Sequence, residues 1–111
     1  MQIQQLSVFV ENKPGRLAEI TEALAGAGVD IRAISVADTS DFGILRVIVD
    51  KPQQAVEALK SHGMTVSLTN VIAVGFDDRP GCFASAVRLL ADKGFDMEYM
   101  YAFISRDKGK A

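Results

Sequence analysis

Two short stretches of the chain have the residue types that could hold a small ligand. Residues 11–17 read Glu-Asn-Lys-Pro-Gly-Arg-Leu, and residues 77–83 read Asp-Asp-Arg-Pro-Gly-Cys-Phe. Gly15 has no Cβ atom, so backbone can approach a ligand closely there, and free N–H groups at a helix start can hold a carboxylate. The side chain of Asn12 both donates and accepts, so it can bond either end of a zwitterion. We predict that these turns bind a small ligand.

A strand and a helix must position the first turn. Residues 3–10 alternate between apolar and polar side chains, which predicts a half-buried strand. Pro14 suits a first helical position, where its missing N–H is not needed. Leu17, Ile20 and Leu24 then follow at helical spacing and form one apolar stripe. The turn is therefore expected to connect a strand to an amphipathic helix.

The next residues extend this pattern. Residues 29–37 predict a second strand, and the apolar parity shifts between Ile31 and Ile34, which indicates a bulge. A central strand is expected at Phe42–Val49, a helix from Pro52 to the His-Gly pair at 62–63, and a strand at residues 64–68. The order is βαββαβ, so the sequence predicts an α+β, ferredoxin-like unit with both helices on one face of a four-stranded sheet.

The pattern then restarts at a fixed offset of 66 positions. Ten residues of the first copy are identical to their counterparts in one ungapped register: Val8, Pro14, Gly15, Ala18, Leu24, Ala25, Gly28, Asp30, Asp41 and Gly43. This identity predicts an internal repeat, with a first unit at residues 1–69 and a second, C-terminally incomplete β-α-β copy at residues 70–111. A strand at residues 97–105 would lack its natural neighbour. We expect a fragment of a longer chain, and the alternative is a last strand that pairs with a sister subunit.

Composition excludes several classes of protein. The 111 residues carry a net charge of −2 and a pI of about 5.3, so no basic surface is available for nucleic acid. One cysteine and one histidine exclude a Cys/His metal cluster, and no cofactor is expected. No apolar run approaches the roughly 20 residues that span a bilayer, and the N-terminus does not resemble a signal peptide. We expect a cytoplasmic protein without a membrane partner.

With its two Pro-Gly turns and the run Ala-Gly-Val-Asp-Ile at residues 27–31, the sequence resembles the ACT domain family of amino-acid-sensing regulatory modules. Residues 11–17 are similar to the turn of the regulatory domain of phosphoglycerate dehydrogenase and to that of the acetolactate synthase regulatory subunit. The tandem layout is similar to small stand-alone double-ACT proteins. In that family two units pair side by side into an eight-stranded sheet, and an amino acid binds at their interface.

The resemblance implies a set of ligand-binding residues in the two turns and at the two second strands. Carried over by position, they are Asn12, Lys13, Pro14, Gly15, Arg16, Leu17, Asp30 and Ile31 in the first unit, with Asp78, Pro80, Gly81, Cys82, Phe83, Asp96 and Met97 in the second. The family often has Asn where this chain has Asp30. Asp78 stands where the first copy has Asn12, so the two turns are not expected to bind with equal affinity.

Simpler structural roles stand beside these assignments. Asn12 and Gly15 could only shape a helix-start turn, and Cys82 could be a small packing residue, since no base accompanies it. No nucleophile–base pair or carboxylate dyad points to an enzyme. The resemblance therefore implies a non-catalytic regulatory module that binds a free amino acid between ACT units, as a homodimer that modulates a metabolic enzyme. The alternative is a regulatory subunit of a biosynthetic enzyme such as acetolactate synthase.

Overall fold

The structure is a computed structural model that describes residues 2–11, 13–38, 42–105 and 107–111. The chain divides into two compact units, Met1–Ile72 (unit 1) and Ala73–Ala111 (unit 2). The division falls three residues after the boundary expected from the repeat. Among the described residues, no helix has both the length and the apolar character needed to cross a membrane.

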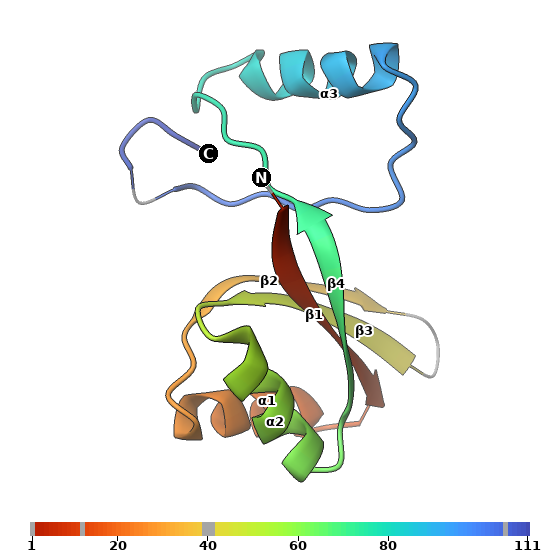
Figure 1. Ribbon diagram of the computed structural model, residues 1–111, viewed down its shortest axis with the longest axis vertical. Helices are drawn as coiled ribbons and strands as arrows, with labels where there is room; N and C mark the ends of the chain where they lie inside the picture. The colour runs from red at the N-terminus through yellow and green to blue at the C-terminus, as the bar shows by residue number, and fades with distance from the viewer. Residues whose placement is uncertain (1, 12, 39–41, 106) are drawn as a thin grey trace. The chain divides into compact units, whose positions relative to one another are not determined.

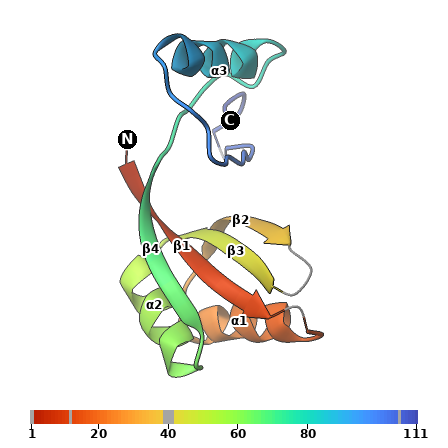
Figure 2. The same ribbon diagram turned by 90° about the vertical axis from the view of Figure 1, so that its right-hand side faces the viewer.

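Unit 1 has the predicted βαββαβ order. Its elements are β1 (Gln2–Glu11), α1 (Arg16–Gly26), β2 (Ile31–Asp38), β3 (Phe42–Val49), α2 (Pro52–Ser61) and β4 (Thr65–Ile72). The strands form one antiparallel sheet in the order β2-β3-β1-β4, and both helices cover the same face of it (Figures 1 and 2). This arrangement confirms the α+β, ferredoxin-like prediction for the first unit.

The core of unit 1 lies between the sheet and its two helices. Alternate residues of the central strands face the helices, because successive strand side chains point to opposite faces. Leu6 and Val8 of β1 are fully buried there, and so are Ile20 of α1 and Leu59 of α2. Ile20 and Leu24 of the stripe predicted in the first helix therefore point inward, whereas Leu17 at its start is 46% exposed. This packing fixes where the turn after β1 lies.

Two boundaries differ from the sequence prediction. Pro14 is not a helical residue: α1 begins at Arg16, because Gly15 takes a left-handed conformation with φ of 85° and is the N-cap. Strand β4 extends to Ile72 rather than ending at residue 68, because β1 already starts at Gln2 and pairs Gln2 with Ile72. The helix thus begins directly after the Pro-Gly pair and not at Pro14.

The bulge predicted in β2 is confirmed. Ile31 pairs with Val49 and Ala33 with Ile48, so the pairing register shifts at Arg32. Beyond this point, Ile34 and Val36 lie opposite buried β3 residues, yet they are 45% and 58% exposed. Among the described residues of unit 1, β3 is the strand that pairs with β2, so the other edge of β2 carries exposed apolar side chains and no described strand pairs with it.

In unit 2, one helix stands where the repeat predicts it. Helix α3 (Cys82–Asp92) follows a turn whose Asp77 pairs with Lys110 in an isolated antiparallel bridge. The strand expected at residues 97–105 does not form in the described part of the chain. A strand needs a neighbour for its backbone hydrogen bonds, and no strand lies along this segment there. The predicted pattern of the second copy is therefore present only in its turn and helix.

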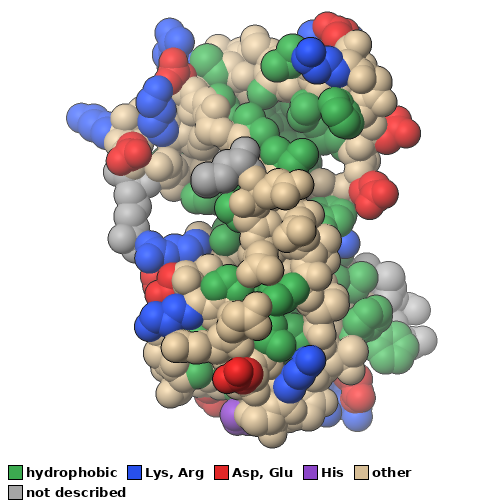
Figure 3. Space-filling model, viewed as in Figure 1, with side chains coloured by type: hydrophobic (Ala, Val, Ile, Leu, Met, Phe, Trp, Pro, Cys, Tyr) green, Lys and Arg blue, Asp and Glu red, His purple; other side chains and the backbone are tan. Residues whose placement is uncertain are grey.

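Unit 2 exposes much of its apolar surface. None of the residues of α3 is buried, and every buried apolar residue in the described ranges belongs to unit 1. Figure 3 shows hydrophobic side chains in green at the surface near α3. The exposed large apolar residues of this unit are Val74, Phe83, Leu89, Phe95, Met97, Tyr99, Met100, Phe103 and Ile104.

Candidate ligand-binding site

The turn between β1 and α1 is built by backbone hydrogen bonds. Lys13 N–H donates to the Glu11 carbonyl over 2.8 Å, Arg16 N–H to the Lys13 carbonyl over 3.3 Å, and Glu19 N–H to the Gly15 carbonyl over 2.9 Å. No side chain caps α1, and in the described part of the chain the N–H groups of Leu17 and Ala18 have no acceptor. Two N–H groups at a helix start are therefore available to an anionic group.

The turn before α3 repeats this geometry 66 positions later. Arg79 N–H donates to the Asp77 carbonyl over 2.9 Å, and Ser85 N–H donates to the Gly81 carbonyl over 3.0 Å. Gly81 is the N-cap with φ of 90°, close to the value at Gly15, and no side chain caps this helix either. The two Pro-Gly turns thus have the same backbone conformation in both units.

Charged side chains of the first turn neutralise one another. The Glu11 carboxylate lies 2.9 Å from Lys13 Nζ and 3.8 Å from Arg16 Nη2, and Arg16 also pairs with Glu19 at 3.0 Å. The hydrogen bond from Lys13 holds the pKa of the Glu11 carboxyl below its ordinary value of 4.5, and the charges of Lys13 and Arg16 add to this effect. The cations of the turn are therefore already paired, so the N–H groups are its best anion-binding feature.

The second turn depends on a different cation. Lys110 donates a hydrogen bond to the Asp77 carboxylate and lowers its pKa, and Arg79, at 3.2 Å, contributes less. The same contact raises the pKa of Lys110. Cys82 replaces the cation of Arg16 here and is a half-buried free thiol.

Lowered carboxyl pKa values give the turn a pH dependence with a definite sign. A carboxyl whose pKa is lower in the folded state stabilises that state above its unfolded pKa, and this stabilisation is lost as the pH falls through the folded pKa. We expect Glu11→Gln to be less stable than the parent chain at pH 7. The difference should close as the pH falls below about 4.5 and should shrink in high salt. Urea unfolding at several pH values measures it, and a difference that persists at pH 2 would contradict the assignment.

The start of β2 holds the other predicted contact. The Asp30 N–H donates to the Asp50 carboxylate over 2.9 Å, and the Asp50 N–H donates to the Asp30 carbonyl over 3.1 Å. The Asp30 carboxylate lies 3.5 Å from Arg32 Nε and is largely exposed. The backbone of Asp30 is thus fixed, and its carboxylate is presented to the outside of unit 1.

Strand register separates the two halves of the predicted site within unit 1. The end of β1 pairs Glu11 with Phe42 at the start of β3, whereas the start of β2 pairs Ile31 with Val49 at the end of β3. The eight residues of β3 span about 23 Å. The first turn and Asp30 therefore lie at opposite ends of the sheet, and one unit cannot close them on a single small ligand.

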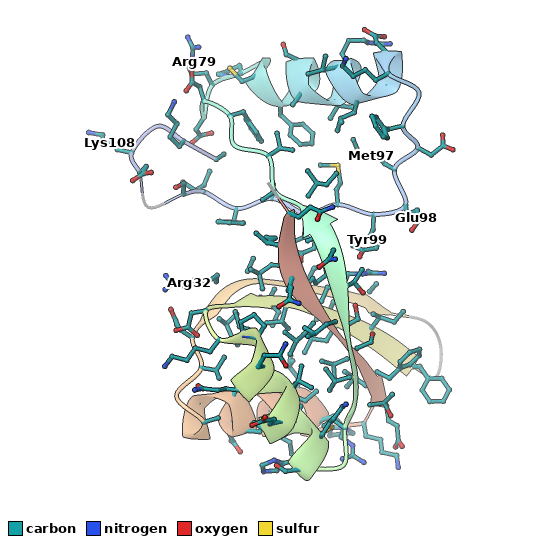
Figure 4. The ribbon with its side chains drawn as sticks, viewed as in Figure 1. Arg32, Arg79, Met97, Glu98, Tyr99 and Lys108 are labelled. Carbon is teal, nitrogen blue, oxygen red and sulfur yellow. The ribbon has the colours of Figure 1, made fainter. Side chains whose placement is uncertain are left out.

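Unit 2 shows the same separation along its helix. Arg79 precedes α3 and Met97 follows it; Figure 4 shows Arg79 beside the start of the helix and Met97 on the segment that continues from its far end. Eleven helical residues span about 16 Å. A hollow of about 330 Å³ adjoins the turn and is lined by Phe76, Asp78, Phe83, Ala102, Phe103, Ile104 and Ala111.

Most of the predicted site residues are exposed. Asn12 lies outside the described residues. Of the others, Lys13, Pro14, Gly15, Leu17, Asp30, Asp78, Pro80, Gly81, Phe83, Asp96 and Met97 are exposed, and Arg16, Ile31 and Cys82 are half-buried. Two residues beside the predicted set were not predicted: Ala18, whose backbone N–H lies at the start of α1, and Arg32, which lies at the bulge in β2. In the described ranges, no group of three or more His, Cys, Asp or Glu residues could hold a metal ion.

The chain belongs to the family of ACT domain pairs, whose model matches residues 1–111. This finding confirms the predicted family and the tandem arrangement. The crystal structure of protein BT0572 from Bacteroides thetaiotaomicron is similar over 99% of this chain and 75% of that protein, with 40% sequence identity and a TM-score of 0.92.

Two structures of aspartate kinase regulatory subunits share the fold at lower identity. The ligand-free subunit from Thermus thermophilus has a TM-score of 0.69 and 22% identity, over 90% of this chain and 76% of that one. The subunit from Thermus flavus has a TM-score of 0.65 and 19% identity, over 99% and 82%. No protein with curated function matches this sequence.

Proposed function

We propose that this chain is a non-catalytic regulatory module that binds a free amino acid at a site shared between two ACT units. Membership of the ACT domain pair family and the fold shared with aspartate kinase regulatory subunits support a regulatory role. The module acts as a homodimer in the cytoplasm, and the binding of its ligand changes the activity of a metabolic enzyme. Such coupling requires that the ligand bind one arrangement of the units better than another.

The observation that carries this proposal is the separation of the two halves of the site. Because β1 and β2 run parallel, the β1–α1 turn lies at the end of the sheet where β2 finishes. If two ACT units pair their β2 edges antiparallel about a two-fold axis, the turn of one unit comes beside the β2 start of the other. The exposed Ile34 and Val36 supply apolar surface for such an edge-to-edge contact.

Each half of this composite site suits one end of an amino acid. The N–H groups of Leu17 and Ala18 in one unit bind the α-carboxylate. In the other unit, the residue that corresponds to Asp30 accepts hydrogen bonds from the ammonium group. Leu17 is 46% exposed and gives the ligand an apolar wall. The second turn binds more weakly, because Asp78 puts a carboxylate beside it where the first turn has Asn12.

A thermal-shift screen of the twenty amino acids tests the proposal. A ligand at 100 times its Kd stabilises the folded state by about 2.7 kcal/mol. We expect one amino acid, or a small chemically related group, to raise the melting temperature. The screen uses about 20 µM protein and each amino acid at up to about 10 mM, which covers ordinary metabolite affinities. An unchanged melting temperature with all twenty amino acids would reject the proposal.

A further inference from the structure

Arg32 occupies an unusual position at the edge of the sheet. It is the extra residue in β2, because Ile31 and Ala33 pair with the consecutive β3 residues Val49 and Ile48. A bulge of this kind re-aims side chains and is common next to binding sites. Figure 4 shows the Arg32 side chain near the edge of the unit 1 sheet, directed away from the strands. The bulge therefore presents a guanidinium group on the free β2 edge.

Within the described residues, Arg32 forms an ion pair with Asp30, the residue proposed to bind the ammonium group of the ligand. Arg32 Nε lies 3.5 Å from Asp30 Oδ2, with the two side chains 42% and 58% exposed. Since Asp50 fixes the backbone of Asp30, the guanidinium is held beside the proposed ligand position. When the ammonium group of a ligand pairs with the Asp30 carboxylate, the Arg32 guanidinium loses the partner that neutralised its charge. A second carboxylate on the ligand can then neutralise Arg32.

The counterpart of Arg32 in unit 2 has the opposite charge. Glu98 stands 66 positions later, four residues after the left-handed glycine Gly94, as Arg32 stands four residues after Gly28. The chain bends at Glu98 and forms no strand there. The repeat therefore does not keep a positive charge at this position.

We propose that Arg32 is a specificity-determining residue that binds the side-chain carboxylate of a dicarboxylic amino acid. This inference rests on the proposed function. The helix-start N–H groups bind the α-carboxylate, Asp30 binds the ammonium group, and Arg32 binds the remaining carboxylate. Every charge of the ligand then has a partner of opposite sign or a hydrogen-bond donor. A neutral amide in the same place leaves the guanidinium without a counter-charge, so the site prefers aspartate or glutamate over asparagine or glutamine.

Isothermal titration of the 111-residue chain with L-aspartate, L-glutamate, L-asparagine and L-glutamine tests this specificity. A charged hydrogen bond contributes about 1.5–3 kcal/mol, equivalent to about a tenfold to hundredfold change in Kd. We expect Arg32→Gln to weaken acid binding by that factor and to change amide binding by less than about twofold. Arg32→Glu, which copies the residue of unit 2, should abolish acid binding. Arg88→Gln, on the exposed surface of α3, is the matched control and should change nothing.

The outcomes separate this inference from the proposal beneath it. If a neutral or basic amino acid binds and the two acids do not, the specificity inference is wrong and the regulatory proposal stands. If the acids bind best but Arg32→Gln keeps the preference, Arg32 is not its cause. If none of the twenty amino acids binds, both are wrong. Circular dichroism of each variant confirms that the chain is folded before its titration is interpreted.

Discussion

Replacing Leu24 by alanine should cost unit 1 about 3 kcal/mol of its free energy of unfolding. Leu24 is 1% exposed and packs in the core between α1 and the sheet. Truncating a buried leucine loses its transfer free energy and leaves a cavity, which together cost about 2–5 kcal/mol. Since a domain of this size has about 5–15 kcal/mol in total, the variant should unfold at a much lower urea concentration.

Leu90 is the matched control for this variant, because it is the counterpart of Leu24 in unit 2. It is only half-buried, and its helix has no buried residue. We expect Leu90→Ala to cost less than about 1 kcal/mol. Equal losses for the two variants would show that α3 has a core as complete as that of α1, and would contradict the described difference between the two units.

Ala18→Glu should abolish the amino-acid-induced thermal shift without weakening the fold. Ala18 is exposed at the third position of α1, next to one of the N–H groups proposed to bind the ligand carboxylate. A glutamate at this position places a negative charge beside the proposed position of the ligand α-carboxylate and repels it. The same charge stabilises the helix N-terminus by about 0.3–1 kcal/mol. The loss of about 2.7 kcal/mol of ligand stabilisation would therefore not be an effect of unfolding.

Ala84→Glu is the corresponding change in unit 2. Asp77 and Asp78 already make the second turn acidic, so it contributes less to ligand binding. We expect this variant to keep most of the shift seen with the parent chain. A full shift in Ala18→Glu would show that the ligand does not use the first turn, and thermal-shift curves of both variants at the same ligand concentration give the comparison.

Local patterns predicted most of unit 1. The alternation in β1 and the helical spacing of Ile20 and Leu24 report which faces are buried, and burial decides both elements. The parity shift between Ile31 and Ile34 located the bulge for the same reason. A Pro-Gly pair, in contrast, fits either a first helical position or a turn, so the sequence could not place the start of α1.

The failures in unit 2 have a nonlocal cause. Residues 97–105 contain Tyr99, Tyr101 and Phe103 in alternation, which is typical of a strand, but a strand forms only against a neighbour. Propensity is local and pairing is not. The incomplete repeat already indicates that this segment lacks its natural neighbour, and no strand takes that place in the described part of the chain.

The sequence located the parts of the candidate site but not their arrangement. The two turns were found because they repeat, and their backbone geometry agrees closely. That the first turn and Asp30 lie at opposite ends of the sheet follows from strand register alone. Ala18 was not predicted because an N–H group has no residue signature. The parity shift located the bulge but not the residue at which the register changes, so Arg32 was not predicted either.

A backbone amide NMR titration tests the central claim most directly. The chain, labelled with nitrogen-15, is titrated with the amino acid that gives the largest thermal shift. A site shared between units predicts that the amide signals of Leu17 and Ala18, and that of Asp30 about 23 Å away in the same unit, move together with a single Kd. Changes confined to one end of unit 1, or to residues remote from both ends, would contradict a shared site.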